Sequence, residues 1–383
     1  MEYSPKNMEY RFRKVESSYL VWLQALNRYL HLEEPAFRIL KQFKEGLTPQ
    51  EMIRECEERY QLPLKEAKRF IGEMQEQFII LYQDYQKPEL ASLPLDAVPL
   101  PSLKPIERFI RVKDHRVRFS FGDPNVEQFI FPIFSHLEIP PGPKSYDLHI
   151  EVYFHNGSLY LIKNQEHAFK WKMAHAQKLK GTIMLDVINV MHKLTEESWM
   201  GVIHASSVCQ GKQSVMFPAQ PGAGKSTLAA LLIAHGCRLV SDDFTPVALE
   251  NQHLYPFPGA ISVKQGSMPL LKSYFPELES APEVLNPSKG GKVSYLAPPD
   301  PLPLTEGGYA VSAIVFVQYD GESDCELERV NNLELINDFL NESWLAHKAQ
   351  AAEQFMDWYL GTPCYKLRYG NHKKAVESIQ KLF

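Results

Sequence analysis

The feature that most constrains this chain is a glycine-rich stretch, Ala219 to Thr227, with the sequence A-Q-P-G-A-G-K-S-T. It matches the pattern A/G-x-x-x-x-G-K-S/T, in which glycines let backbone N–H groups turn toward phosphate oxygens. We expect a buried strand at 213–218 and a helix at 225–235, so the stretch should join a strand to the positive end of a helix dipole. This context predicts a nucleotide-binding loop in an α/β domain.

Each position of this loop has an expected task. The Lys225 ammonium would reach the β- and γ-phosphates of ATP, and the Ser226 hydroxyl would coordinate Mg²⁺. Ala219 stands where glycine is commoner, and the pattern allows it. The alternative is a glycine-rich turn that binds no ligand. The candidate nucleotide-binding positions are Ala219, Gly222, Ala223, Gly224, Lys225, Ser226 and Thr227.

Two acidic residues, Asp242 and Asp243, follow the next expected strand, 238–241. If that strand runs parallel to 213–218 and beside it, both carboxylates face the metal and the γ-phosphate. One would bind Mg²⁺, with Asp242 the candidate, and one would take a proton from an acceptor hydroxyl, although the sequence does not assign the two roles. Alternatively, the pair caps a turn at the strand end. A single histidine in an expected strand 201–208, His204, is by itself more typical of a core or surface position.

The segment 201–245 resembles the catalytic core of the HPr kinase/phosphorylase family, and more closely the HPr-kinase-related enzymes that phosphorylate ribosomally made peptides. In that family a histidine precedes the phosphate-loop lysine and an aspartate pair follows it at similar spacings. Here His204 precedes Lys225 by 21 residues, and Asp242 and Asp243 follow it by 17 and 18. The resemblance implies a kinase that uses ATP and Mg²⁺, with these four residues catalytic.

Two further stretches, 256–264 and 289–299, resemble the peptide-modifying branch of the same family. The resemblance implies that Lys264 and Lys292 approach nucleotide or substrate phosphates, whereas the sequence alone is more typical of solvated lysines. The E-x-R-G-x-G signature of true HPr kinases is missing downstream, which disfavours HPr as the substrate and phosphorolysis as a second activity.

Residues 88–105 hold five prolines and predict a semi-rigid linker. Before it, aromatic-rich strands are expected at 10–15, 19–23 and 26–32, followed by three helices, the second opening with the capping box Thr48-Pro-Gln-Glu51. This order is winged-helix-like and resembles PqqD-like peptide-recognition domains. The resemblance implies that a peptide adds as a strand beside Leu26–Leu32; a purely structural appendage is the alternative.

The expected fold class is α/β. A P-loop domain of the HPr-kinase/PEP-carboxykinase type with a mixed sheet should follow a small α+β domain. The expected boundaries are 1–87 for the peptide-recognition domain, 88–105 for the linker, 106–200 for a β-rich part of the kinase region, and 201–383 for the catalytic domain.

Charge and composition exclude several classes of protein. The chain carries 41 Lys+Arg against 46 Asp+Glu, a formal net charge of −5, and residues 1–90 carry 14 against 15, a net of −1. This balance disfavours nucleic-acid binding, which needs a basic face. No apolar run is long enough to cross a membrane, no signal peptide is evident, and the five cysteines form no CxxC pair. We therefore expect a cytoplasmic protein, as a monomer or a homo-oligomer.

These observations favour an ATP-dependent kinase of a serine or threonine hydroxyl on a peptide or small protein. A small-molecule hydroxyl kinase and a nucleotide-gated regulatory protein without turnover are the alternatives. The identity of the phosphate acceptor, the reversibility of transfer and the oligomeric state lie beyond the sequence.

Overall fold

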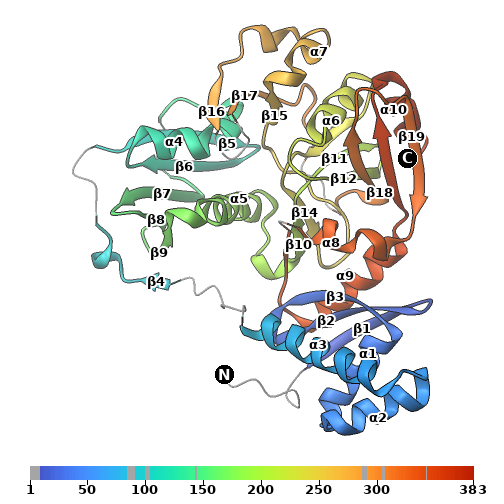
Figure 1. Ribbon diagram of the computed structural model, residues 1–383. Coiled ribbons are helices and arrows are strands. Elements are labelled where there is room, and N and C mark those ends of the chain that lie inside the picture. The colour runs from blue at the N-terminus through green and yellow to red at the C-terminus, as the bar shows by residue number, and fades with distance from the viewer. Residues whose placement is uncertain are drawn as a thin grey trace. The chain divides into compact units, whose positions relative to one another are not determined.

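The computed structural model describes residues 9–83, 91–99, 104–142, 145–286, 291–303, 307–341 and 343–383. It is a mixed α/β structure, and its parts form two compact units (Figure 1). The first comprises Met1–Glu89 with Leu345–Gly361, and the second comprises Leu90–Trp344 with Thr362–Phe383. Within the described residues no helix is both long and apolar enough to span a bilayer.

The first unit begins with a three-stranded antiparallel meander, as the alternating aromatic segments predict. Three helices follow, and Thr48 and Glu51 form the expected reciprocal cap at the start of the second one. Their apolar faces cover one side of the sheet, where Val21, Leu40 and Ile71 are fully buried. The elements are β1 (Tyr10–Val15), β2 (Ser18–Leu23), β3 (Arg28–Glu33), α1 (Glu34–Glu45), α2 (Pro49–Tyr60) and α3 (Leu64–Gln83).

The other side of this sheet is covered by a helix from much later in the chain, α9 (Ala349–Gly361). The Tyr29 ring meets Phe355 edge-on with centroids 4.9 Å apart, and the Arg13 guanidinium holds both carboxylate oxygens of Asp357 at 2.6 and 2.8 Å. The expected boundary of the catalytic domain at 201–383 is therefore wrong for Leu345–Gly361. A long-range contact of this kind leaves no local trace in the sequence.

The second unit contains two six-stranded sheets. The first has the order β4-β9-β8-β7-β6-β5 and includes two antiparallel hairpins, β5–β6 and β7–β8. Figure 1 shows α5 lying along it. Its strands are β4 (Ala91–Leu93), β5 (Ile106–Val112), β6 (His115–Phe121), β7 (Leu148–His155), β8 (Ser158–Lys163) and β9 (His167–Lys172); the helices are α4 (Pro124–Ile130) and α5 (Ala176–His192). Because β4 pairs with β9, part of the segment predicted as a linker, 88–105, belongs to this sheet.

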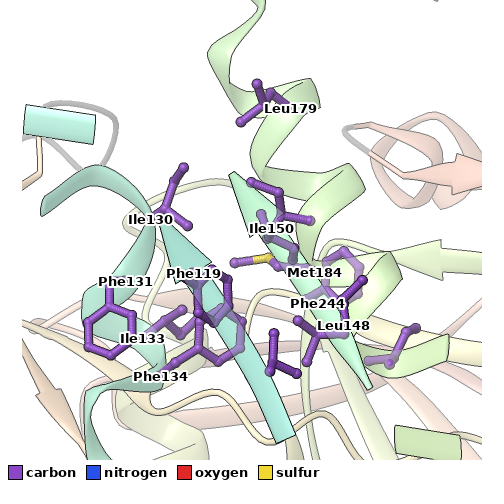
Figure 2. Packing of buried hydrophobic residues seen from close by; sticks show 14 of the residues in the cluster. Phe119, Ile130, Phe131, Ile133, Phe134, Leu148, Ile150, Leu179, Met184 and Phe244 are labelled. Atoms are coloured by element: carbon purple, nitrogen blue, oxygen red, sulfur yellow. The ribbon is translucent and has the colours of Figure 1, made fainter. Parts of the chain in front are cut away.

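A hydrophobic core fills the space between this sheet and its helices (Figure 2). Phe119 on β6, Ile150 on β7 and Ile183 on α5 are fully buried there. The same core includes Phe244, which Figure 2 also labels. Since Phe244 directly follows the aspartate pair, the core holds the end of that segment in place.

The second sheet has the order β13-β11-β12-β18-β21-β19. Strand β11 runs antiparallel to both β12 and β13, whereas β12, β18 and β21 are mutually parallel. Strands β12, β13, β18 and β21 therefore all end at the same edge. The elements are β11 (Ala205–Gln210), β12 (Gln213–Pro218), α6 (Lys225–Ala234), β13 (Arg238–Ser241), β18 (Ala310–Tyr319), β19 (Cys325–Val330), β21 (Cys364–Tyr369) and α10 (His372–Gln380).

One expectation for this region needs correction. The strand predicted at 201–208 is broken at His204 into β10 (Trp199–Ile203) and β11. The stretch after Asp243 contains several strands, among them β15, whose residue Ser262 contacts Asp242. The remaining elements are β14 (Thr245–Ala248), β15 (Ile261–Lys264), α7 (Met268–Lys272), β16 (Val284–Asn286), β17 (Gly291–Leu296), α8 (Ile336–Leu340) and β20 (Trp344–Leu345).

Candidate functional site

The glycine-rich stretch forms a turn between β12 and the N-terminus of α6, as the sequence predicts. Gly222 and Gly224 have φ angles of +94° and +99°, a region that residues with a side chain rarely adopt. A Cβ on Gly224 would lie 3.0 Å from Tyr319 Cβ and 3.1 Å from the Tyr369 hydroxyl. The loop is also tied to β18, because the Tyr319 N–H donates to the Ala223 carbonyl at 2.9 Å. These contacts require glycine at position 224.

Lys225, the first residue of α6, is buried, yet its ammonium is well paired. Its Nζ lies 2.9 Å from Asp243 Oδ1 and 3.2 Å from His204 Nε2. An ammonium can only donate, so His204 Nε2 accepts, and the ring carries its proton on Nδ1. That nitrogen lies 3.2 Å from the Asp243 carbonyl oxygen and donates to it. His204, Lys225 and Asp243 therefore form one connected group, although His204 and Asp243 are 39 positions apart in the sequence.

Asp242 occupies a different environment, because its carboxylate is 2% exposed and surrounded by donors. Oδ1 accepts from the Ser226 hydroxyl at 2.9 Å and from the Ser206 hydroxyl. Oδ2 accepts from the Ser262 backbone N–H at 3.0 Å and from its hydroxyl at 3.3 Å. Hydrogen bonds to the ionised form offset the cost of burying the charge. The side chain is thus held in one orientation beside Ser226.

Asp243 has a φ of +61°, the left-handed region that is uncommon for residues other than glycine. Ser207, Ser241 and Thr245 hold the neighbouring backbone through buried hydroxyls, with Ser207 Oγ 2.7 Å from Ser241 Oγ and the Thr245 hydroxyl donating to the Ala205 carbonyl at 2.8 Å. Strained backbone of this kind persists only where the surroundings hold it in place, and it clusters at functional sites.

The aspartate pair lies beside the loop, but the order of the strands differs from the expected one. Strand β13 was expected beside β12, but β11 lies between them. Because β11 is antiparallel to both, β12 and β13 still run in the same direction and end at one edge. The expected meeting of carboxylates and loop is therefore found, with one strand interposed.

The two lysines singled out by resemblance are not brought together. In the antiparallel pair β15–β17, Lys264 is opposite Val293, so Lys292 points to the other face of the ribbon. Lys264 shares a face with Ser262 and hence with the Asp242 side of the site. Lys292 is exposed and lies 3.0 Å from Glu283. Of the two, only Lys264 lies on the ribbon face that carries Ser262.

Sequence reasoning missed several residues of this site. Ser206 and Ser262 hold Asp242, and their only signal was a hydroxyl within a short strand. Asp338 on α8 and Asn341 after it border a small recess beside Ala219, Gln220, Pro221 and His204. Nothing in the local pattern of α8 indicates that it lies beside the loop.

The donor set fits Mg²⁺ and a polyphosphate. Mg²⁺ prefers oxygen ligands and commonly binds one or two carboxylates together with phosphate oxygens, and the Ser226 hydroxyl and Asp242 carboxylate meet here at 2.9 Å. Among the described residues no group of three or more His, Cys, Asp and Glu side chains could hold a metal alone; phosphate oxygens and waters would complete the shell of a bound Mg²⁺. No known family model matches the sequence, and no curated protein matches it.

Proposed function

We propose that this chain is an ATP-dependent kinase that phosphorylates a hydroxyl group of a peptide or small protein. The observation that carries the proposal is the group at the N-terminus of α6. There Lys225 contacts both Asp243 and His204, and Ser226 contacts Asp242. A cation, a hydroxyl and two carboxylates at a turn rich in positive φ angles are the parts that phosphoryl transfer needs.

The two aspartates suit different roles, which the sequence left open. Asp242 is fixed by hydroxyls and a backbone N–H and lies against Ser226, so it suits a metal ligand with Ser226. Asp243 is held through its own carbonyl by His204 and through its carboxylate by Lys225. Its carboxylate would accept the proton of the acceptor hydroxyl once the Lys225 ammonium has turned toward the phosphates. His204 would act as a positioning residue.

ATP·Mg²⁺ bound at this turn would supply the phosphoryl group and neutralise its charge. The chain's own contribution would then be electrostatic and geometric. Lys225 would turn from Asp243 to the phosphates, which leaves the Asp243 carboxylate open toward the acceptor. The loop N–H groups of 222–226 would hold the phosphate oxygens at the positive end of α6.

A peptide acceptor is supported by an open strand edge in the first unit. Strand β3 pairs with β2, and within the described residues its other edge has no neighbour in the sheet. The Glu34 N–H donates to the Ser17 carbonyl at 3.2 Å. By the alternation of an antiparallel ladder, the Leu30 and Leu32 backbones face β2, and that of His31 faces outward. An extended peptide could bond to this edge.

The test follows phosphate transfer from ATP to a pool of serine- and threonine-containing peptides by mass spectrometry. Lys225→Ala should lower transfer by at least about 10²-fold, because a phosphate-binding charge is lost. Lys381→Ala, which changes an exposed lysine, is the control. Equal transfer by wild type and Lys225→Ala would mean that the site is elsewhere. Nucleotide binding with neither transfer nor hydrolysis would instead favour a regulatory protein.

The acceptor class is tested at β3 rather than by deletion, since removing residues 1–87 would uncover Phe355 on α9. His31→Pro removes only an outward N–H and should reduce peptide phosphorylation, whereas His31→Ala keeps that N–H and should not. A small-molecule kinase would be unaffected by both.

A further inference from the structure

We propose that Tyr319 and His372 form a platform on which the nucleotide's base stacks. The inference rests on the proposed function and extends it, because it assigns the part of the site that recognises the nucleoside. Tyr319 is the last residue of β18, Tyr369 is the last of β21, and His372 is the first of α10.

The platform lies on the correct side of the loop for a nucleoside. In the sheet order β13-β11-β12-β18-β21-β19, the aspartates follow β13 on one side of β12, and the aromatic residues follow β18 and β21 on the other. All these strands except β11 and β19 end at the same edge, which is where ligands of open α/β sheets bind. If the terminal phosphate lies against Lys225 and Asp243, the nucleoside must leave the loop away from them.

Tyr319 is tied directly to the loop. Its N–H donates to the Ala223 carbonyl at 2.9 Å, and its Cβ lies 3.0 Å from where a Cβ on Gly224 would be. The Cβ that carries the Tyr319 ring is therefore within van der Waals distance of the phosphate turn. Nevertheless, Tyr319 is 48% exposed, so a large part of an aromatic surface beside the loop is open.

The three rings support one another. Tyr319 and His372 are stacked, with centroids 5.6 Å apart and an interplanar angle of 18°. Tyr369 meets Tyr319 edge-on at 5.5 Å and His372 at 5.9 Å. Burial lowers the pKa of His372 below its ordinary value, which keeps the imidazole neutral near pH 7. The result is a flat, uncharged and preorganised surface.

The charges around the platform are paired, which favours a neutral ring over a second phosphate as its occupant. Arg368 lies 2.5 Å from Asp320, and Lys374 lies 2.5 Å from Asp324. Base–aromatic stacking tolerates any base, because each one has a π-face. We therefore expect the platform to contribute affinity without strong choice between ATP and GTP.

The chain offers a matched control at the opposite end of α6. Tyr274 is 42% exposed and meets the His235 ring at 5.5 Å with an interplanar angle of 53°. His235 is the C-terminal cap of α6, so this second tyrosine–histidine pair is separated from the phosphate turn by the length of the helix.

The test measures binding by calorimetry, without turnover, for a non-hydrolysable ATP analogue and for inorganic tripolyphosphate, each with Mg²⁺. Tyr319→Ala should weaken binding of the analogue by about 5- to 50-fold and leave binding of tripolyphosphate unchanged. Tyr319→Phe should bind as wild type does, and so should Tyr274→Ala. Tyr319→Leu, which keeps apolar packing on the loop but lacks a flat ring, should behave as Tyr319→Ala does.

The outcomes separate this inference from the proposed function. If wild type binds tripolyphosphate and the analogue, but Tyr319→Ala binds the analogue normally, the platform is refuted and the kinase proposal stands. Equal weakening of both probes by Tyr319→Leu would also refute the platform, since the change would then act through the loop. If wild type binds neither probe, both proposals are wrong.

Discussion

The two sides of the phosphate turn are built from different chemistry. On the acid side, Lys225, His204 and Asp243 are joined by contacts of 2.9 to 3.2 Å, so each one depends on its partners. On the aromatic side, Tyr319, Tyr369 and His372 touch mainly through their rings. A polar network can shift protons and charge, whereas a stacked surface can only supply affinity and orientation. We infer that the acid side governs rate and the aromatic side governs binding.

The largest effect should come from the acid side. Asp243→Asn removes the proposed base and should lower the rate of transfer by about 10²- to 10⁴-fold, with little change in the binding of the ATP analogue. Single-turnover rates and calorimetry measure the two quantities separately. A parallel loss of binding and rate would mean that Asp243 acts through the position of Lys225 and not as a base.

The same substitution at the adjacent aspartate, Asp242→Asn, should affect stability differently. Its amide nitrogen would face the hydroxyls and N–H that Asp242 now accepts from, and one mismatched buried donor costs about 1–3 kcal/mol. We expect the unfolding midpoint of Asp242→Asn to fall further than that of Asp243→Asn, because an asparagine at 243 still offers Lys225 an amide oxygen and suits a φ of +61°. Equal midpoints for both would contradict the different roles inferred from their contacts.

A smaller effect should come from the loop itself, where the two sides meet. Gly224→Ala combines a φ of +99° with contacts to Tyr319 and Tyr369, whereas Gly222→Ala has a φ of +94° and nothing within 4 Å. Both variants carry the same cost, about 1–2 kcal/mol, of placing alanine at a positive φ. The difference between them therefore measures only the steric contact of the new methyl group with Tyr319 and Tyr369. We expect Gly224→Ala to bind the ATP analogue about ten-fold more weakly than Gly222→Ala does.

A second substitution, Tyr369→Phe, should partly restore the binding of the ATP analogue by Gly224→Ala. The Tyr369 hydroxyl is buried and, in the part of the chain that the structure describes, has no hydrogen-bond partner; burial raises the pKa of this phenol. Tyr369→Phe removes the hydroxyl oxygen 3.1 Å from the added methyl group and should restore part of the binding lost in Gly224→Ala. No restoration would mean that the Tyr319 contact alone decides the effect.

Local patterns predicted the loop, its flanking strand and helix, and the strands and helices of the first unit. They succeeded because glycine φ angles, capping boxes such as Thr48–Glu51 and alternating apolar residues act over a few positions. Strand order does not follow from such patterns, which is why the interposed β11 was missed. The partners Ser206 and Ser262 of Asp242, and the packing of α9 on the first unit's sheet, depend on contacts between distant segments. The acid side was therefore predicted from sequence and the aromatic side was not.

The smallest predicted effect is on the aromatic side, where His372 should make the stability of the protein depend on pH. Burial lowers the pKa of His372, so the folded protein keeps this ring neutral at pH values where the unfolded chain, with a pKa of about 6.5, takes up a proton. Since the unfolded state then binds more protons, stability must fall as pH drops below about 6.5 and level off below the lowered pKa. Between about pH 7.5 and about pH 5, the unfolding midpoint of wild type should fall by up to about 2–4 °C more than that of His372→Phe. Equal falls in the two proteins would mean that folding does not lower the pKa of His372, and the ring would then become charged below about pH 6.5 instead of staying neutral.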